Sequence, residues 1–191
     1  MTDLTKIRRP VLFAAGVAAA ATGVAAYGYI RRKLYPSLAT VPHVDLHKYS
    51  GLWYEIARLP TRFEKGCQHV TANYKLRPDG QMSILNTCHQ QSLTGPLETA
   101  NGIARAVDPT NAKLRVSFFW PFEGDYWILE LDHSDYRYAL VGTPSRKNLW
   151  LLSRTPHLER SRRDKLVATA REKGFPVDKL LFTPQPVADK P

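Results

Sequence analysis

The chain has 191 residues, of which 43% are hydrophobic and 23% are charged, which is typical of one folded domain with an appendage and excludes a disordered chain. Its net charge is +10, and half of that excess lies in residues 1–40, which hold six basic side chains and one acid. Because this charge flanks an apolar run, it favours a membrane surface as the partner over nucleic acid. Proteins that bind nucleic acid more often cluster their basic and aromatic residues on the folded domain.

The apolar run spans residues 11–30 and contains no charged side chain. Twenty helical residues are long enough to cross the hydrocarbon core of a bilayer. We therefore expect residues 1–42 to form an N-terminal apolar helix that serves as an uncleaved membrane anchor, followed by a tether. A signal peptide that is cleaved near Ala26 is the alternative. No cysteine directly follows the run, so this position offers no site for an N-terminal lipid.

Short segments rich in β-branched and aromatic residues follow, with brief connections between them. A helical turn over residues 45–50, capped by Asp45 and ended by Gly51, precedes the first of these segments. The segment 113–119 alternates apolar and polar residues, which is typical of a sheet with one solvated face. The pattern predicts eight strands, at residues 53–59, 70–76, 81–88, 102–107, 113–119, 126–131, 136–141 and 148–153.

The C-terminal part of the chain has a helical pattern. Ser161 and Asp164 match a capping box, which predicts a helix from Ser161 to about Lys173 with Gly174 as its end. Its apolar stripe is narrow enough for the helix to lie on the outside of a sheet. Residues 179–183 are predicted to form a last short strand.

The order of these elements predicts the fold class. Eight antiparallel strands without βαβ crossovers favour an all-β barrel or a sandwich, and an eight-stranded barrel has room for one small ligand. We expect an up-and-down barrel, or calyx, over residues 43–186 with one α-helix packed outside it, and a tail at residues 187–191.

Three motifs, in this order, resemble those of the lipocalin family and of its bacterial outer-membrane, apolipoprotein D-like branch in particular. The first is Gly51-x-Trp53 with Tyr54 and Glu55 behind it, the second spans residues 131–141, and the third spans residues 149–156. The resemblance implies a calyx closed at one end, where a guanidinium stacks on a tryptophan in a cation–π contact. It places four residues at this structural base, namely Gly51, Trp53, Asp132 and Arg154.

The resemblance also implies where a ligand binds. Tyr74, Asn86 and Trp150 match the Tyr, Asn and Trp that line the cavity in lipocalins similar to apolipoprotein D. Strand parity adds further apolar lining residues, among them Ala72, Val116 and Phe118. A buried hydroxyl and amide need hydrogen-bond partners, which a ligand's head group would supply, or which they find in each other or in trapped water. The ligand that fits such a lining is a fatty acid or a lysophospholipid.

Two cysteines, Cys67 and Cys88, lie near the outer ends of the two strands that the turn at residues 77–80 joins. They are almost opposite in the predicted ladder, allowing for a bulge, and a disulfide there suits an oxidising compartment such as a periplasm. The alternative is a free thiol in the cavity, although His69 and His89 are not well placed to activate it.

No catalytic constellation, metal-ligand spacing or dinucleotide fingerprint occurs in the sequence. We therefore expect no enzymatic activity, no cofactor, no metal site and no nucleic-acid partner. Glu55 has the strand parity of Trp53, so its carboxylate is expected to bind either a head group or the barrel floor.

The leading hypothesis is a lipid-binding carrier, acting in membrane lipid transport, storage or maintenance. It would be anchored in a bacterial cell envelope, with the barrel in the periplasm. The choice of inner or outer membrane is left open, as is a homodimer. The alternatives are a lipocalin-fold enzyme of the isomerase or de-epoxidase type, and an envelope interaction protein with a filled barrel.

Overall fold

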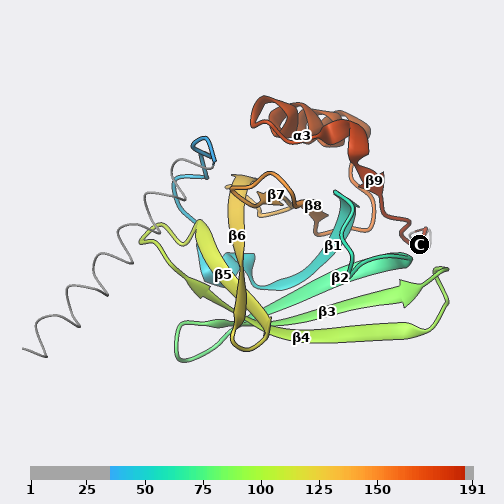
Figure 1. Cartoon of the computed structure of the whole chain (residues 1–191), viewed down its shortest axis with the longest axis horizontal. Coiled ribbons are helices and arrows are strands. Elements are labelled where there is room, and N and C mark those ends of the chain that lie inside the picture. Colours follow the sequence, from blue (N-terminus) through green and yellow to red (C-terminus); the bar gives the residue numbers. More distant parts are fainter. Residues whose placement is uncertain (1–34, 188–191) are drawn as a thin grey trace, which may run out of the picture. The chain divides into compact units, whose positions relative to one another are not determined.

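The computed structural model describes residues 35–187 (Figure 1). The chain divides into two compact units, Met1–Ser37 and Leu38–Pro191, and the second carries every element described below. The anchor predicted at residues 11–30 lies outside the described residues. Within the part that is described, no helix is both long enough and apolar enough to cross a bilayer.

Eight antiparallel strands close into a barrel, as predicted (Figure 1). Each strand pairs with the next one in sequence, and β1 pairs with both β2 and β8, which closes the sheet. The strands are β1 (Gly51–Arg58), β2 (Cys67–Leu76), β3 (Met82–Gln90), β4 (Leu97–Ala106), β5 (Lys113–Phe119), β6 (Phe122–Leu131), β7 (Tyr138–Gly142) and β8 (Leu149–Ser153).

Several strands begin at a residue other than the predicted one. Strands β2 and β6 begin three and four residues early, at Cys67 and Phe122. Strand β4 begins at Leu97, five residues before its predicted start, because its polar first half pairs with β3 from His89 to Leu85 and this pairing overrides the weak β propensity of its sequence. Strand β7 begins at Tyr138, because Tyr136 has a φ of 55° and belongs to the turn before it.

Short helices flank the barrel at both ends of the chain. Helix α2 (Leu46–Tyr49) confirms the predicted helical turn, and Asp45 caps it by accepting hydrogen bonds from the backbone N–H groups of His47 and Lys48. After the barrel, the 3₁₀ helix η1 (Val177–Lys179) replaces the first residue of the predicted last strand. Only β9 (Leu181–Phe182) remains of that strand, and it pairs with β1.

Helix α3 (Arg160–Glu172) packs outside the barrel, as predicted, and buries Leu166 and Ala170 (Figure 1). The predicted capping box is wrong, because the helix starts at Arg160 and both box residues lie inside it. Asp164 pairs instead with Arg163 at 3.0 Å. The helix ends where expected, because Gly174 has a φ of 85°, which a glycine adopts without strain.

Two hydrophobic cores result from this arrangement. One fills the closed half of the barrel, and the other lies between the barrel wall and α3, where Leu140 and Leu151 meet Leu166. Leu38 and Val41, in the predicted tether, are also buried, and the Val41 N–H donates to the Ile128 carbonyl at 3.0 Å. The end of the predicted tether is therefore part of the packed structure.

The closed end is built around Trp53 and Arg154. Trp53 is fully buried, and the Arg154 guanidinium carbon lies 3.9 Å from the centroid of its ring. The guanidinium also donates to four backbone carbonyls before and within the start of β1, those of Lys48 at 2.7 Å, Tyr49 at 3.2 Å, Ser50 at 2.9 Å and Leu52 at 2.9 Å. One side chain directly after β8 thus fixes the path of the chain that enters the barrel.

The other two predicted base residues support this contact. Gly51 has a φ of 99°, and a Cβ on it would lie 3.2 Å from the Arg154 guanidinium, so a larger residue would crowd the cation. Asp132 accepts hydrogen bonds from the backbone and side chain of Arg137 and from Ser134, which fixes the β6–β7 turn. That turn includes Tyr136, whose carbonyl accepts a hydrogen bond from Arg154 at 3.2 Å.

Replacing Arg154 with alanine should lower the free energy of unfolding by about 3 kcal/mol, because both the cation–π contact and charged hydrogen bonds are lost. Urea denaturation measures this loss. The matched control is Arg77→Ala, whose exposed side chain pairs with the exposed Asp79 and is expected to contribute less than about 1 kcal/mol. Equal losses in the two variants would contradict the role assigned to Arg154.

Candidate ligand-binding site

The barrel contains a cavity of 370 Å³, a size typical of small-molecule sites. Its lining includes residues from the β1–β2, β5–β6 and β7–β8 connections, so the cavity extends toward the end of the barrel opposite Trp53 and Arg154. The six residues predicted from sequence to bind ligand all lie in its wall: Ala72, Tyr74, Asn86, Val116, Phe118 and Trp150.

A cluster of three tyrosines lies on the side of the cavity that faces the base. Tyr74 donates a hydrogen bond to the hydroxyl of Tyr126 at 2.9 Å, and Tyr49 shares a hydrogen bond of 2.8 Å with the same hydroxyl. Burial raises the pKa of Tyr74 to about 12 and also raises the pKa of Tyr126, so both stay neutral. The hydroxyl of Tyr74 therefore has an internal partner, and Asn86 is not that partner.

Asn86 presents the opposite case. Its side-chain oxygen is buried and has no hydrogen-bond partner among the described residues. A buried acceptor left unpaired costs about 1–3 kcal/mol, so it favours any occupant of the cavity that brings a donor. The cavity wall thus combines an apolar lining with one acceptor to which a head group could donate.

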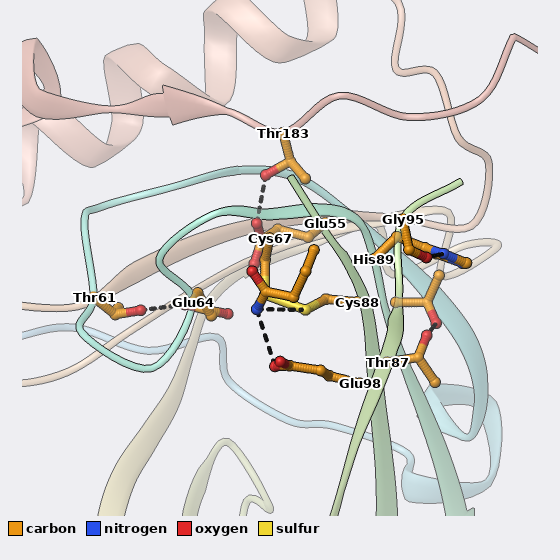
Figure 2. Close-up of a disulfide and its surroundings, with 12 residues drawn as sticks. Glu55, Thr61, Glu64, Cys67, Thr87, Cys88, His89, Gly95, Glu98 and Thr183 are labelled. Atoms are coloured by element: carbon orange, nitrogen blue, oxygen red, sulfur yellow. Dashed lines mark hydrogen bonds between the residues drawn. A yellow bond between two sulfur atoms is a disulfide. The ribbon is translucent and has the colours of Figure 1, made fainter. Parts of the chain in front are cut away.

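A buried polar cluster lies at the other side of the cavity, toward the mouth. Arg58 donates to the Glu55 carboxylate at 2.7 Å and to the Glu64 carbonyl at 2.6 Å. Thr183 donates to the same Glu55 oxygen, and the Glu64 carboxylate accepts a hydrogen bond from Thr61, as Figure 2 shows. The indole nitrogen of Trp150 lies 3.4 Å from both carboxylate oxygens of Glu64.

This cluster holds two carboxyl groups and one guanidinium. Burial, and then the charge of Glu64, raise the pKa of Glu55 to about 8, although Arg58 opposes the shift. At neutral pH Glu55 carries a proton, and that proton makes the cluster neutral. Glu55 therefore binds Arg58 and Thr183 within the protein, and it lies near the mouth, away from the barrel floor.

Cys67 and Cys88 form a disulfide, with their Cα atoms 5.4 Å apart, which confirms the predicted pairing. Cys67 lies directly opposite Gln90 in the ladder, and a register shift between Gln68 and Thr71 brings Cys88 within reach. The nitrogen of the Gln90 side-chain amide lies 3.7 and 3.8 Å from the two sulfurs and donates to Glu98 at 2.9 Å. Neither cysteine is free, so the cavity contains no thiol nucleophile.

Two histidines lie beside the disulfide. The rings of His69 and His89 stack at 5.2 Å, and His89 Nδ1 is hydrogen-bonded to the Gly95 carbonyl. Among residues 35–187, no group of three or more His, Cys, Asp or Glu side chains is placed to hold a metal ion.

Sequence reasoning missed several residues that line the cavity or support its wall, among them Tyr126, Glu64 and Arg58. Tyr126 was detectable, because it pairs with Leu114 on β5 and so shares the inward parity of Val116. Arg58 and Glu64 were not, because a register shift between Glu55 and Ala57 breaks the alternation of β1 and Glu64 lies in a loop.

Comparison with known proteins identifies relatives of this chain. The family model for the lipocalin-like domain matches residues 44–185. Outer membrane lipoprotein Blc of Vibrio cholerae is 43% identical over 150 residues, which cover 78% of this chain and 87% of that protein. Apolipoprotein D of Macaca fascicularis is 34% identical over 148 residues, covering 74% and 77%. Insecticyanin of Manduca sexta, at 23% identity, has the same fold, with a TM-score of 0.65 over 81% of this chain and 87% of that structure.

The raised pKa of Glu55 predicts a pH-dependent stability. The folded protein holds the Glu55 proton up to about pH 8, whereas the unfolded chain loses it near pH 4.5. The proton's contribution is thus fully present below pH 4.5 and is lost as the pH rises through 8. Between these values the free energy of unfolding should fall by up to about 1.4 kcal/mol per pH unit.

The Glu55→Gln variant has no carboxyl proton to lose. It should therefore lack the part of the fall in the free energy of unfolding with pH that Glu55 causes. Urea denaturation at a series of pH values compares it with the wild type and with Glu172→Gln, an exposed control that should keep the wild-type slope. A Glu55→Gln variant with the wild-type slope would contradict the assignment.

Proposed function

The chain belongs to the lipocalin family, and on this premise we propose that it is a carrier that holds a fatty acid or a lysophospholipid in its barrel at a bacterial cell envelope. Family membership rests on the lipocalin-like match over residues 44–185 and on the Vibrio cholerae relative at 43% identity. A lipocalin barrel binds small hydrophobic ligands, and the residues of this cavity narrow the choice of ligand.

The observation that carries the proposal is an apolar cavity with one unpaired buried acceptor in its wall. Burial of each methylene of an acyl chain against the lining contributes about 0.8 kcal/mol. The acyl chain of the ligand would lie against residues from several strands, including Val70, Ile84, Val116 and Leu152. The Asn86 oxygen would accept a hydrogen bond from a hydroxyl, protonated carboxyl or ammonium group at the ligand's polar end.

Two observations support an envelope location. The name of the Vibrio cholerae relative describes it as an outer membrane lipoprotein. The Cys67–Cys88 disulfide suits an oxidising compartment, which favours a barrel in the periplasm. The apolar run at residues 11–30 would supply the anchor.

The expectation that the chain is not an enzyme stays a prediction. The relatives described above are named as an outer membrane lipoprotein, an apolipoprotein and insecticyanin, and none of these names describes a reaction. A cysteine-based isomerase would need a free thiol, and both cysteines of this chain are oxidised.

A larger side chain that fills the cavity should weaken ligand binding. Ala72 lines the cavity, whereas the next residue, Asn73, is exposed on the outer wall. We expect Ala72→Trp to weaken binding of a fluorescent fatty acid such as cis-parinaric acid at least tenfold, a loss of about 1.4 kcal/mol or more. Asn73→Trp should bind like the wild type. Fluorescence titration measures both affinities, and urea denaturation checks that both variants fold. Equal affinities in two folded variants would contradict a ligand site inside the barrel.

Asn86 should select ligands that carry a donor. The wild type is expected to bind a long-chain alcohol about fivefold more tightly than the methyl ether of the same chain, the effect of one net hydrogen bond of about 1 kcal/mol. Asn86→Leu should bind the two equally while gaining stability, because it removes an unpaired buried oxygen. Competition against cis-parinaric acid gives these affinities. An alcohol preference that survives in Asn86→Leu would contradict the role of Asn86.

A further inference from the structure

Large apolar side chains stand exposed around the mouth of the cavity. Three come from the hairpin of β5 and β6, where Phe119 at the end of β5 is 78%, Trp120 in the connection is 91% and Phe122 at the start of β6 is 77% exposed. A fourth, Phe63 at 72% exposed, comes from the connection between β1 and β2. We call these four residues the aromatic rim. Soluble proteins seldom expose aromatic side chains in such a group, and a patch of this kind marks an interaction surface.

The aromatic rim is continuous with the interior of the barrel. Phe63, Phe119 and Phe122 belong to the cavity lining as well as to the exposed surface. Phe118, which precedes the hairpin tip, also lines the cavity and is 36% exposed. An apolar path therefore leads from the outside of the protein, over the aromatic rim, to the site proposed for the acyl chain.

Basic side chains surround the aromatic rim. Arg62 and Lys65 lie on either side of Phe63 in the β1–β2 connection, and Lys147 precedes the cavity residue Asn148 in the β7–β8 connection. All three are exposed, and within residues 35–187 none of them forms a salt bridge. They are therefore available to an anionic partner.

The acidic side chains at the mouth are mostly neutralised. Glu98, at the start of β4, is exposed and accepts a hydrogen bond from Gln90. Four carboxyl groups line the cavity. Glu55 and Glu64 share Arg58, whereas Glu123 pairs with Arg105 and Asp125 pairs with Arg115. The charge left uncompensated around the aromatic rim is thus positive.

We propose that the aromatic rim docks on the surface of an anionic lipid bilayer, so that the acyl ligand passes between bilayer and barrel without crossing water. Aromatic side chains prefer the interface of a bilayer, and lysines and arginines beside them are attracted to anionic head groups. A bilayer also fits the position of the patch, because it leaves the mouth in contact with lipid, whereas a protein partner would cover the mouth. The inference rests on the proposed function, since it explains how a lipid would enter this cavity.

The test reads the position of Trp120 in the full-length protein. Vesicles of phosphatidylcholine and phosphatidylglycerol with brominated acyl chains quench only tryptophans that reach the lipid. Because residues 1–34 contain an apolar run, the readout is the quenched emission of Trp120 and not vesicle binding. The wild type is compared with Trp120→Phe and with the control Trp127→Phe. Trp127 belongs to β6, and its half-buried ring lies 4.8 Å from the ammonium of Lys113 on β5.

Docking predicts strong quenching in the wild type and in Trp127→Phe, and a quenched component smaller by roughly twofold or more in Trp120→Phe. A triple variant, Arg62→Gln with Lys65→Gln and Lys147→Gln, should lose most of the quenching on anionic vesicles. The matched triple, Lys75→Gln with Lys165→Gln and Lys179→Gln, removes the same charge from exposed positions elsewhere and should leave quenching unchanged. Raised salt should act like the first triple variant.

Two results would overturn the proposal. If brominated lipid does not quench Trp120 but acrylamide does, the aromatic rim faces water. If neither quenches it, another part of the chain, a second copy or a protein covers the aromatic rim. A cis-parinaric acid titration on the same preparation distinguishes these outcomes from a failure of the proposed function. If the barrel still binds the probe, only the docking proposal is wrong, and the proposed carrier function stands.

Discussion

One guanidinium determines which end of this barrel is closed. Arg154, directly after β8, extends across the base, stacks on the ring of Trp53 and binds the carbonyls of the chain that enters β1. A charge that is held by carbonyl oxygens and an aromatic face keeps its hydrogen bonds while water is excluded beneath it. Because this end is filled, the space that the barrel cannot pack with its own side chains opens toward the opposite end.

The kind of side chain that lines the cavity consequently changes from the base to the mouth. Near the base, Tyr74 and Tyr126 satisfy each other and stay neutral. Toward the mouth, Glu55 shares Arg58 with a second carboxyl group and takes up a proton that neutralises the cluster. Between them lies an apolar wall with the unpaired oxygen of Asn86. Among the described residues, the buried polar groups of the cavity wall are paired within the protein, except for the Asn86 oxygen. Such a cavity binds an apolar chain and discriminates among head groups mainly at Asn86.

The strand pattern was predictable because it follows from local alternation and turn chemistry, and the motif around Trp53 together with Arg154 indicated which end closes. Parity also placed Ala72, Val116 and Trp150 in the cavity wall. The mouth was not predictable. A register shift in β1 buries Arg58, and the position of Phe63 depends on a loop that no periodicity describes. The start of α3 was mispredicted because Ser161 and Asp164 imitate a cap and yet lie inside the helix.

The central claim is that this barrel carries one lipid molecule. Native mass spectrometry of the full-length protein, extracted from its membrane in a mild detergent and transferred without delipidation, tests the claim most directly. The account predicts one added mass per barrel, which tandem fragmentation identifies as a single-chain lipid with a hydroxyl, carboxyl or ammonium group at its polar end. A folded barrel that carries no added mass, and that takes up neither a fatty acid nor a lysophospholipid when these are supplied, would contradict it.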